Sequence, residues 1–345
     1  MRNTKRLVCC KFFLGKPEFI GGASILKAIV TGGCGFIGSH LVDALMSMGY
    51  EVIVIDNLSN GSKANVERWL GHPKFRLVES DLKKYSSSWV DCFRGVDVVF
   101  HFAANPEVRV SVANPRVHFE ENIQATFNVL EACRVHHVPY LVFASSSTVY
   151  GDAKVIPTPE DYHPLEPISV YGACKLACEN LIISYSKLYG IRSLILRYAN
   201  IIGPRSNHGV IIDFINKLRK DPTKLEILGD GTQRKSYLYI SDCINATLHL
   251  FNTFTKEDKE YDIYNVGNED WVTVKEIADI IVKEMGLENV KYEFKPATPD
   301  GRGWPGDVKL MLLDITKLKT TGWKPQLTSR DTIKASIISY LITIL

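Results

Sequence analysis

The stretch Thr31-Gly32-Gly33-Cys34-Gly35-Phe36-Ile37-Gly38 lies between the apolar run 26–30 and an amphipathic segment, and it decides the fold. Gly32 permits a tight turn from strand to helix, Gly35 lets a pyrophosphate approach the backbone, and Gly38 lets the helix pack closely on the sheet. The free N–H groups and the dipole at the start of such a helix hold phosphate groups. The stretch therefore predicts a dinucleotide-binding turn.

A carboxylate follows this turn at the expected distance. Asp56 ends the next apolar run, about twenty residues further along the chain. At that place a carboxylate binds the hydroxyls of the adenosine ribose and repels a 2′-phosphate. We therefore expect NAD, rather than NADP, as the cofactor.

Apolar runs alternate with segments of helical apolar spacing through the first 200 residues. Such alternation is typical of a parallel sheet that helices cover on both faces. The expected strands are 28–31, 51–56, 75–79, 96–101, 140–144 and 193–198, and the expected helices include 36–48, 116–136 and 171–189. The pattern predicts an α/β fold with a Rossmann-type, doubly wound parallel sheet.

The alternation loosens after residue 200, which suggests a smaller C-terminal lobe interleaved with the first. Its expected helices are 208–220, 241–254 and 273–285, and its expected strands are 225–228, 261–266 and 291–294. The predicted division is a dispensable N-terminal extension at 1–25, an NAD-binding domain at 26–200, a mainly substrate-binding lobe at 201–330 and a C-terminal helix at 331–345.

The bulk properties exclude several classes of function. A net charge of +3 gives no field that favours nucleic acid or an anionic membrane. No apolar run reaches the ~20 residues of a membrane span. The eight cysteines show neither paired zinc spacing nor a disulfide framework, so we expect no metal site. Reduced thiols of this kind indicate a cytoplasmic protein.

Tyr171 and Lys175 carry the second chemical signal, because residues four apart lie on one face of a helix. A tyrosine has a reference pKa of about 10, which is too high for a base at neutral pH. A nearby ammonium and a positive nicotinamide ring both favour the phenolate and lower that pKa. At this place Lys175 can also hold the ribose of the nicotinamide. Together with the glycine turn, the pair predicts redox chemistry on a bound nicotinamide.

Hydroxyl groups gather directly after the expected strand 140–144, in Ser145-Ser146-Ser147-Thr148. In open α/β sheets, ligands bind beyond the carboxyl ends of the strands. A hydroxyl there can hydrogen-bond a reacting sugar oxygen and relay its proton to the tyrosine. Ordinary loop chemistry also uses such residues, so these hydroxyls alone leave both interpretations open.

These motifs, in this order, closely resemble the extended short-chain dehydrogenase/reductase superfamily. Within it the chain is similar to the NAD-dependent nucleotide-sugar epimerases, UDP-glucose 4-epimerases in particular. The resemblance spans residues 26 to about 326 and rests on TGGCGFIGSH (31–40), VIDNLSNG (54–61), Asp81, HFAANPEVRVS (101–111), SSSTVYGD (145–152), YGACK (171–175), LRYANIIGPR (196–205), GDGTQRKSYLYISD (229–242) and GWKP (322–325). It implies an isomerase of carbohydrate metabolism.

The resemblance also implies a role for individual residues. The catalytic residues it implies are Tyr171, Lys175 and Ser146. The cofactor-binding residues it implies are Gly32, Gly35, Phe36, Ile37, Gly38, Asp56, Asn57, Asp81, Leu82, Ala103, Asn122, Tyr171 and Lys175. The substrate-binding residues it implies are Ser146, Ser147, Asn200, Arg234, Lys235, Arg302 and Asp307.

Two departures from the family pattern affect the substrate-binding residues. The family's phosphate-binding arginine aligns with Lys235, while Arg234 stands one place earlier. In addition, Gly-Trp-Pro-Gly separates Arg302 from Asp307, which is longer than the usual spacing. Lysine neutralises a phosphate but lacks the bidentate fork of arginine. The sequence leaves open which of Arg234 and Lys235 faces the phosphate.

The implied reaction inverts C4 of UDP-glucose or UDP-galactose. Tyr171, assisted by Ser146, removes the proton from the sugar 4-hydroxyl while hydride passes from C4 to NAD⁺. The 4-keto sugar then turns over, and hydride returns to its opposite face. The nucleotide anchors the substrate, which leaves the reacting ring free to swing.

Other activities stay open. A 4,6-dehydratase needs an acid/base pair, and that branch of the family has Asp and Glu where this chain has Ser147 and Thr148. A UDP-uronate decarboxylase, which usually has an acid near Thr148 and a basic group for the uronate, and a uronate 4-epimerase are harder to exclude. A non-catalytic dinucleotide-binding regulator is disfavoured because Tyr171 and Lys175 are both present.

The resemblance further implies a homodimer formed by two helices of each subunit, at about 105–135 and 171–190. By motif spacing, Met311 lies near the acetamido position of an N-acetylated sugar. A flexible side chain of medium size there excludes neither plain nor N-acetylated sugars.

Overall fold

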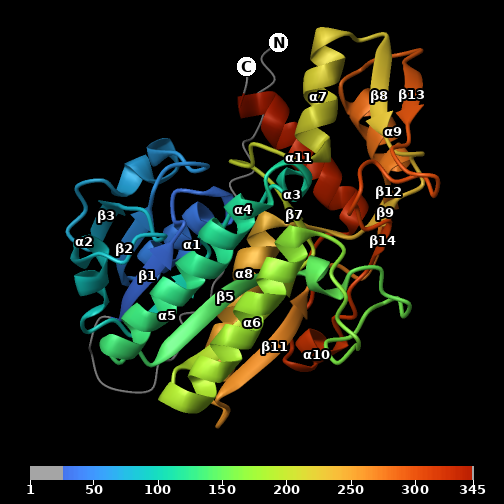
Figure 1. Ribbon diagram of the computed structural model, residues 1–345. Coiled ribbons are helices and arrows are strands. Elements are labelled where there is room, and N and C mark those ends of the chain that lie inside the picture. Colours follow the sequence, from blue (N-terminus) through green and yellow to red (C-terminus); the bar gives the residue numbers. More distant parts are fainter. Residues whose placement is uncertain (1–25, 344–345) are drawn as a thin grey trace.

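Seven parallel strands form the central sheet of the computed structural model, which describes residues 26–343 (Figure 1). Their order is β11-β6-β5-β4-β1-β2-β3, and each neighbouring pair is parallel. The strands are β1 (Lys27–Thr31), β2 (Glu51–Asp56), β3 (Phe75–Glu79), β4 (Val98–His101), β5 (Tyr140–Ser146), β6 (Arg192–Tyr198) and β11 (Tyr261–Val266). The predicted Rossmann-type α/β fold is confirmed. The expectation for residues 1–25 lies outside the described residues.

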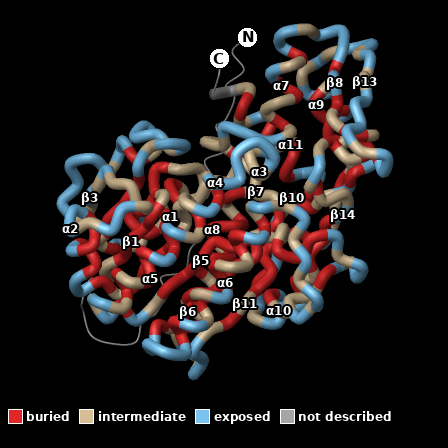
Figure 2. The backbone as a smooth tube through the Cα atoms, in the orientation of Figure 1, coloured by how far each residue is buried: buried red, intermediate tan, exposed pale blue. Residues whose placement is uncertain are grey.

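Helices cover both faces of this sheet, and Figure 2 shows the strands as a buried layer between them. Ile29 and Val30 are neighbours on β1, yet they belong to different apolar clusters because successive strand residues point to opposite faces. The helices on the Val30 face are α1 (Phe36–Ser47) and α8 (Ile240–Phe254). Those on the Ile29 face are α2 (Ser87–Val90), α5 (Ala125–Val135) and α6 (Val170–Tyr189).

A third apolar cluster forms the core of a second lobe. Its elements are α7 (Val210–Lys220), β8 (Lys224–Leu228), β10 (Tyr237–Tyr239), α9 (Val274–Glu284), β13 (Lys291–Lys295) and α11 (Ser329–Thr343). Helix α9 begins where it does because the Thr273 hydroxyl accepts the Glu276 N–H, while the Glu276 carboxylate accepts the Thr273 N–H. Among residues 26–343, no helix is long and apolar enough to cross a bilayer.

Short elements complete the described chain. The strands are β7 (Asn200–Ile202), β9 (Arg234–Lys235), β12 (Val272–Thr273) and β14 (Leu310–Met311). The helices are α3 (Val110–Ala113), α4 (Pro115–His118), α10 (Thr316–Thr320) and the 3₁₀ turns η1 (Lys63–Trp69), η2 (Asp91–Phe93) and η4 (Ser147–Tyr150). The helix expected at 116–136 is not one regular α-helix, because the π-helical segment η3 (Phe119–Gln124) separates α4 from α5.

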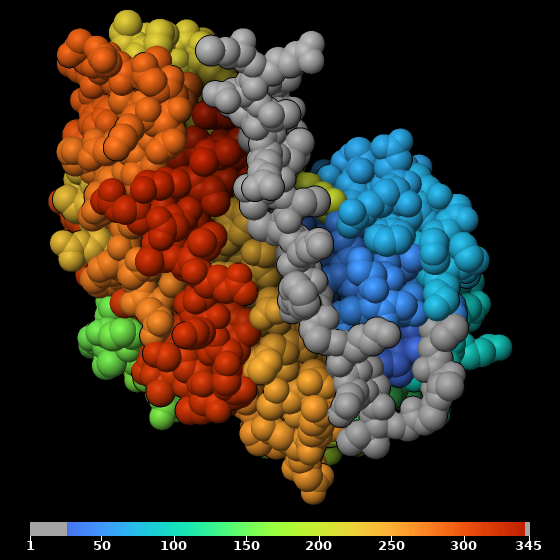
Figure 3. Space-filling view, turned by 180° about the vertical axis from the view of Figure 1, so that it is seen from behind, coloured from blue at the N-terminus to red at the C-terminus, as the bar shows by residue number. Residues whose placement is uncertain are grey.

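The chain returns to the central sheet after the second lobe has begun. Strand β11 pairs with β6, so the strand expected at 261–266 is the edge of the central sheet and not part of the smaller lobe. The Lys317 ammonium of α10 donates to the Ile263 carbonyl at 2.7 Å. In the view from behind (Figure 3), the C-terminal residues, in red, lie beside this returning segment.

A buried ion pair joins α6 to the sheet. Glu179 of α6 and Arg197 of β6 approach to 2.7 Å, and their side chains are only 2% and 3% exposed. Arg197 also donates to the Tyr150 hydroxyl at 2.9 Å and to the Glu160 carbonyl at 3.0 Å. The Ser145 hydroxyl donates to Glu179. Each buried charge is therefore compensated, and the network holds α6 against β5 and β6.

Glu179→Ala is expected to lower the free energy of unfolding by about 3–5 kcal/mol, because it leaves the Arg197 charge buried without its partner. Urea unfolding followed by circular dichroism measures the change. Glu120→Ala is the matched control, since it breaks an ion pair whose Arg116 side chain is 82% exposed and which contributes about 0–1 kcal/mol. Equal losses in the two variants would contradict the expectation.

Candidate active site

The glycine turn brings backbone segments into unusually close contact at the carboxyl end of β1. Gly32 has φ of 68°, and a Cβ on it would lie 2.7 Å from the Ala103 nitrogen. A Cβ on Gly38 would lie 2.2 Å from the Gly32 carbonyl oxygen. A Cβ on Gly35 would meet only that same oxygen, at 3.1 Å. Gly35 therefore borders open space, and no side chain caps the start of α1, so a phosphate can reach its N–H groups.

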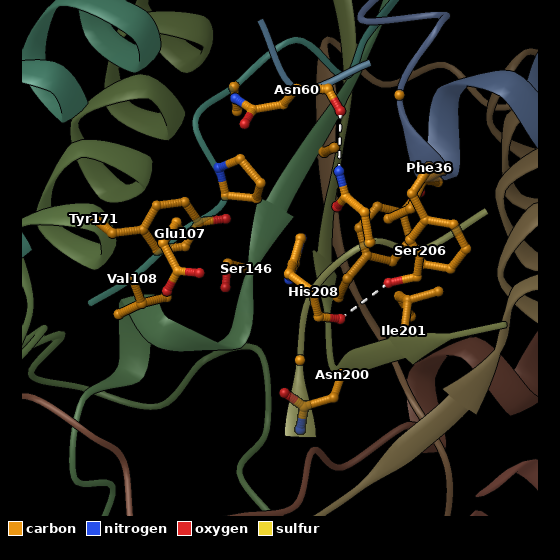
Figure 4. A pocket seen from close by; sticks show the side chains of 18 of the residues that line it. Phe36, Asn60, Glu107, Val108, Ser146, Tyr171, Asn200, Ile201, Ser206 and His208 are labelled. Atoms are coloured by element: carbon orange, nitrogen blue, oxygen red, sulfur yellow. Dashed lines mark hydrogen bonds between the residues drawn. The ribbon is translucent and has the colours of Figure 1, made fainter. Parts of the chain in front are cut away.

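A cavity of about 710 Å³ extends from this turn to the second lobe, a size typical of ligand sites. The predicted residues that line it are Gly32, Gly35, Phe36, Ile37, Gly38, Asp56, Asn57, Asp81, Leu82, Ala103, Ser146, Ser147, Tyr171, Lys175, Asn200, Lys235 and Asp307. Asn122, Arg234 and Arg302 do not line it. Figure 4 shows Tyr171 and Ser146 on one side of the cavity and Phe36 and Ile201 on the other.

Asp56 ends β2 at the wall of this cavity and is 7% exposed. Its carboxylate accepts the backbone N–H groups of Cys34 at 2.9 Å and Leu58 at 2.8 Å. Burial raises its pKa, while these two hydrogen bonds lower it. The bonds fix the carboxylate beside the glycine turn, so the residues present fit the phosphates and adenosine ribose of NAD.

Asn122 is the expected cofactor-binding residue that does not line the cavity. It is 2% exposed, and its side-chain oxygen accepts the backbone N–H of Asn105 at 2.9 Å. Its own carbonyl accepts the Cys178 thiol at 3.5 Å. Asn122 therefore holds the loop that follows β4 against α6, and it does not face the cavity.

Tyr171, Lys175 and Ser146 meet at the carboxyl end of β5. The Lys175 ammonium donates to the Ala144 carbonyl at 2.7 Å and lies 5.9 Å from the centre of the Tyr171 ring. The Ser146 hydroxyl lies close enough to Tyr171 to lower its pKa, and it accepts the Thr148 hydroxyl at 2.9 Å. Helix α6 and strand β5 thus bring the tyrosine, the lysine and the serine to one point of the wall.

Burial moves the two titratable groups of this set in opposite directions. It raises the pKa of Tyr171 to about 12, although the neighbouring Ser146 hydroxyl lowers it. It lowers the pKa of Lys175 to about 8. In each case the low-polarity surroundings disfavour the charged form. A Tyr171 phenolate at neutral pH therefore requires positive charge beside it.

The second lobe contributes Lys235 and Asp307, whose side chains approach to 2.5 Å at the cavity wall. Arg234 is exposed, and its guanidinium stacks over the Trp271 ring at 5.6 Å. Successive residues of a strand point to opposite faces, and β9 consists of these two residues. Lys235, and not Arg234, therefore faces the cavity.

Arg302 is directed away from the cavity by acidic partners. Its guanidinium contacts Asp152 at 2.9 Å and Asp300 at 2.7 Å, and it donates to the Asp307 carbonyl at 2.7 Å. Asn200 lines the cavity while its amide donates to the Ser236 carbonyl at 3.0 Å. The sequence led us to expect two or three cations in this part of the cavity wall. Of those residues, only Lys235 lies there.

Several polar residues of the cavity wall had no assigned role in the expectations from the sequence, among them Glu107, Arg109, His208 and Trp304. Glu107 and Arg109 belong to the motif HFAANPEVRVS, which carried the resemblance without a role for either residue. They pair at 3.1 Å. Trp304 lies in the Gly-Trp-Pro-Gly segment that lengthens the spacing between Arg302 and Asp307. The unusual spacing was the one signal that pointed to this segment.

Comparison with known proteins matches residues 28–267 to the NAD dependent epimerase/dehydratase family. A putative UDP-glucose 4-epimerase of Methanocaldococcus jannaschii is 38% identical over 311 residues, which cover 89% of this chain and 95% of that protein. UDP-glucuronic acid decarboxylase 6 of Arabidopsis thaliana is 33% identical over 317 residues, covering 89% and 87%. A crystal structure of a UDP-galactose 4-epimerase superposes with a TM-score of 0.82 at 50% identity, covering 93% of this chain and 100% of that one.

These likenesses extend over most of the chain and include both the glycine turn and the Tyr171–Lys175 pair. The predictions of an enzyme and of NAD as its cofactor are confirmed. The chain belongs to the NAD-dependent epimerase/dehydratase family.

Proposed function

We propose that the chain is an isomerase of the UDP-glucose 4-epimerase type, which inverts C4 of a UDP-hexose through a transient 4-keto sugar. The observation that carries this proposal is that Tyr171, Lys175 and Ser146 share one cavity with the glycine turn and with Lys235. A proton acceptor, a cofactor-binding turn and a cation for the substrate diphosphate are thereby combined. The epimerases among the similar proteins support the same assignment.

In this proposal Tyr171 and Ser146 handle the proton of the sugar 4-hydroxyl. Bound NAD supplies the oxidising equivalent at C4 and a positive ring that lowers the pKa of Tyr171. Ser146, which lies beside Tyr171, orients the 4-hydroxyl, and the Tyr171 phenolate accepts its proton. Lys175, which is charged below its pKa of about 8, stabilises that phenolate. After the ring turns over, Tyr171 returns the proton to the oxygen on C4.

The alternatives fit the cavity less well. Elimination of water by a 4,6-dehydratase needs carboxyl groups beside Ser146, whereas Ser147 and Thr148 line the wall there. Burial raises the pKa of Glu107, but its hydrogen bonds and charge interaction with Arg109 outweigh this and hold that pKa below its usual range. Glu107 thereby occupies the Arg109 guanidinium, so that cation is already paired and does not offer itself to the carboxylate of a uronate. We therefore rank a neutral hexose above a uronate.

Purified protein incubated with UDP-galactose, without added NAD, is expected to form UDP-glucose, because the reaction returns its cofactor to the oxidised state in every turnover. Chromatography of the nucleotide sugars measures the conversion, and UDP-N-acetylgalactosamine is tested in parallel. UDP-glucuronic acid is the control for the uronate alternatives. Turnover of UDP-glucuronic acid alone would contradict the proposal.

Tyr171→Phe is expected to lower kcat for UDP-galactose by about 10²–10⁴-fold, because it removes the group that takes and returns the proton. The affinity for UDP, measured by calorimetry, stays unchanged, since the phenyl ring remains. Tyr189→Phe removes a hydroxyl from the same helix at a residue that is 51% exposed, and it leaves kcat unchanged. A Tyr171→Phe enzyme with nearly full activity would refute the assigned base.

We further propose a homodimer formed through α5 and α6. Phe127 lies 6.4 Å from Tyr185, ring centre to ring centre, and Tyr185 lies 5.0 Å from Tyr189. The exposed apolar residues of the two helices are Phe127, Val135, Leu188 and Tyr189. Apolar patches on the surface of this kind are typical of protein interfaces.

The six described cysteines are buried and free, which agrees with the cytoplasmic location that we also propose.

Phe127→Asp is expected to convert the dimer to a monomer, because a carboxylate at the centre of an apolar interface loses its hydration without gaining a partner. Gel filtration with light scattering measures the mass, which falls from twice the chain mass of 38.8 kDa to that mass. Leu70→Asp places the same charge at a residue that is 47% exposed but outside α5 and α6, and it leaves the dimer intact. A monomeric wild-type protein would contradict the proposed interface.

A further inference from the structure

A buried histidine packs against the proposed base. His118 is the last residue of α4, its side chain is fully buried, and its ring centre lies 5.6 Å from that of Tyr171. The two ring planes meet at 71°, which is the edge-to-face arrangement that aromatic pairs prefer. Among residues 26–343, His118 is the one ring that packs on Tyr171 in this way. The expectations from the sequence gave His118 no role.

Asn122 determines which nitrogen of His118 carries the proton. The side-chain oxygen of Asn122 accepts the Asn105 N–H at 2.9 Å, so its amide nitrogen is the atom that faces Nδ1 of His118, at 3.4 Å. An amide nitrogen only donates, so Nδ1 accepts, and the proton of the neutral imidazole is on Nε2. Nε2 is buried and has no hydrogen-bond partner among the described residues. A nitrogen so enclosed does not exchange a proton with a substrate.

The charge state of His118 agrees with this arrangement. Burial lowers its pKa, against the opposite effect of the Glu107 and Glu121 charges. A proton added at Nδ1 would also replace the hydrogen bond from Asn122 with a contact between two donors. His118 is therefore a neutral ring at neutral pH. It does not supply the positive charge that the Tyr171 phenolate requires.

The start of α6 depends on the segment that contains His118. Tyr171 is the second residue of α6, where a backbone N–H has no partner within the helix. Its N–H donates instead to the Ser111 hydroxyl of α3, at 3.2 Å. Helices α3 and α4 have four residues each, so they depend on tertiary contacts for their stability. The π-helical segment η3, a rare element that is frequent at functional sites, follows His118 and packs on α6.

The direction of the Tyr171 ring decides whether its hydroxyl can accept a proton. Rotation of a tyrosine ring about its bond to Cβ is only weakly restricted by the side chain itself, so the packing around the ring must fix it. Ser146 lies close to the hydroxyl, whereas His118 packs on the ring. Proton transfer needs the two oxygens within hydrogen-bond reach, and a small tilt of the ring moves the hydroxyl out of that reach.

We propose that His118 is a positioning residue, whose neutral imidazole packs against the Tyr171 ring and directs the phenol hydroxyl at the substrate. This inference rests on the proposed function, because it presumes that Tyr171 is the base. It assigns to the ring of His118 a part in proton transfer that does not involve a proton of its own.

The first test compares two variants that both remove the acceptor of the Asn122 amide. His118→Leu also removes the ring, and it is expected to lower kcat for UDP-galactose by about 10- to 100-fold, the range for a reacting group displaced by about 1 Å. His118→Phe keeps a ring, and it brings kcat back close to the wild-type value. KM and the Kd for UDP stay unchanged in both, because His118 does not line the cavity. Equal kcat values in the two variants overturn the proposal.

The pH dependence of kcat separates positioning from an electrostatic effect. Because His118 is neutral, the pH profile of His118→Phe is expected to follow that of the wild type. A limb that disappears or shifts in this variant overturns the proposal, since it indicates that His118 titrates during the reaction.

A double-mutant cycle tests whether His118 acts through the Tyr171 hydroxyl. In the Tyr171→Phe protein, His118→Leu is expected to cause little further loss of the residual activity, because the hydroxyl that the ring directs is already absent. Losses of the same size in both backgrounds overturn the proposal, because they indicate that His118 only supports the fold.

The wild-type protein provides a test that does not depend on a folded His118→Leu variant. The ¹⁵N shifts of the histidine rings are expected to show one ring that stays neutral, with its proton on Nε2, between about pH 7 and pH 9. His118→Phe identifies this ring by its disappearance. A His118 ring that is charged in this range, or that carries its proton on Nδ1, overturns the proposal.

The outcomes separate this inference from the proposed function. A His118→Leu enzyme with wild-type kcat overturns the role of His118, while the epimerase assignment stands. A wild-type protein that turns over no UDP-sugar refutes the proposed function and, with it, the positioning role that rests on it.

Discussion

The close approach of three backbone segments at the end of β1 is the constraint on which the rest of the site depends. A Cβ at Gly32 or Gly38 would come within 2.7 Å of the Ala103 nitrogen or 2.2 Å of the Gly32 carbonyl oxygen. The Thr31 hydroxyl secures the same junction, since it accepts the Ala103 N–H at 3.2 Å and bonds His101 at 2.7 Å. Because the turn is this tight, α1 begins at the carboxyl edge of the sheet with its first N–H groups directed at the cavity.

Burial governs the chemistry at the opposite wall. It pushes both Tyr171 and Lys175 towards their neutral forms, so the charged pair that proton transfer needs is favoured only when positive charge lies beside the phenol. The Glu179–Arg197 pair holds α6 against the sheet, and the Glu179 charge also raises the pKa of Lys175, against the larger effect of burial.

In the part of the cavity wall that we propose binds the substrate, around Lys235 and Arg109, hydrogen-bond donors matter more than net charge. Lys235 and Arg109 are each neutralised by a carboxylate, and Arg302 is held outside the cavity. A wall of this kind recognises a ligand through the geometry of its acceptors, because the attraction between net charges is small. That property is consistent with a substrate held firmly at its diphosphate and loosely at its sugar.

The sequence by itself determined the sheet, the glycine turn and the Tyr171–Lys175–Ser146 set, because glycine requirements, strand periodicity and the spacing of one helical turn are local properties. Tertiary structure decided the remainder. Residues 261–266 join the central sheet through pairing with β6, which local periodicity does not encode. Lys235 faces the cavity and Arg234 faces Trp271 because β9 pairs with β12 and β14, and pairing sets which face each residue occupies. Arg302 lies outside because Asp152, 150 positions away, pairs with it. Contacts between distant segments have no signature in a single sequence, so the substrate wall was the part that only the folded chain could define.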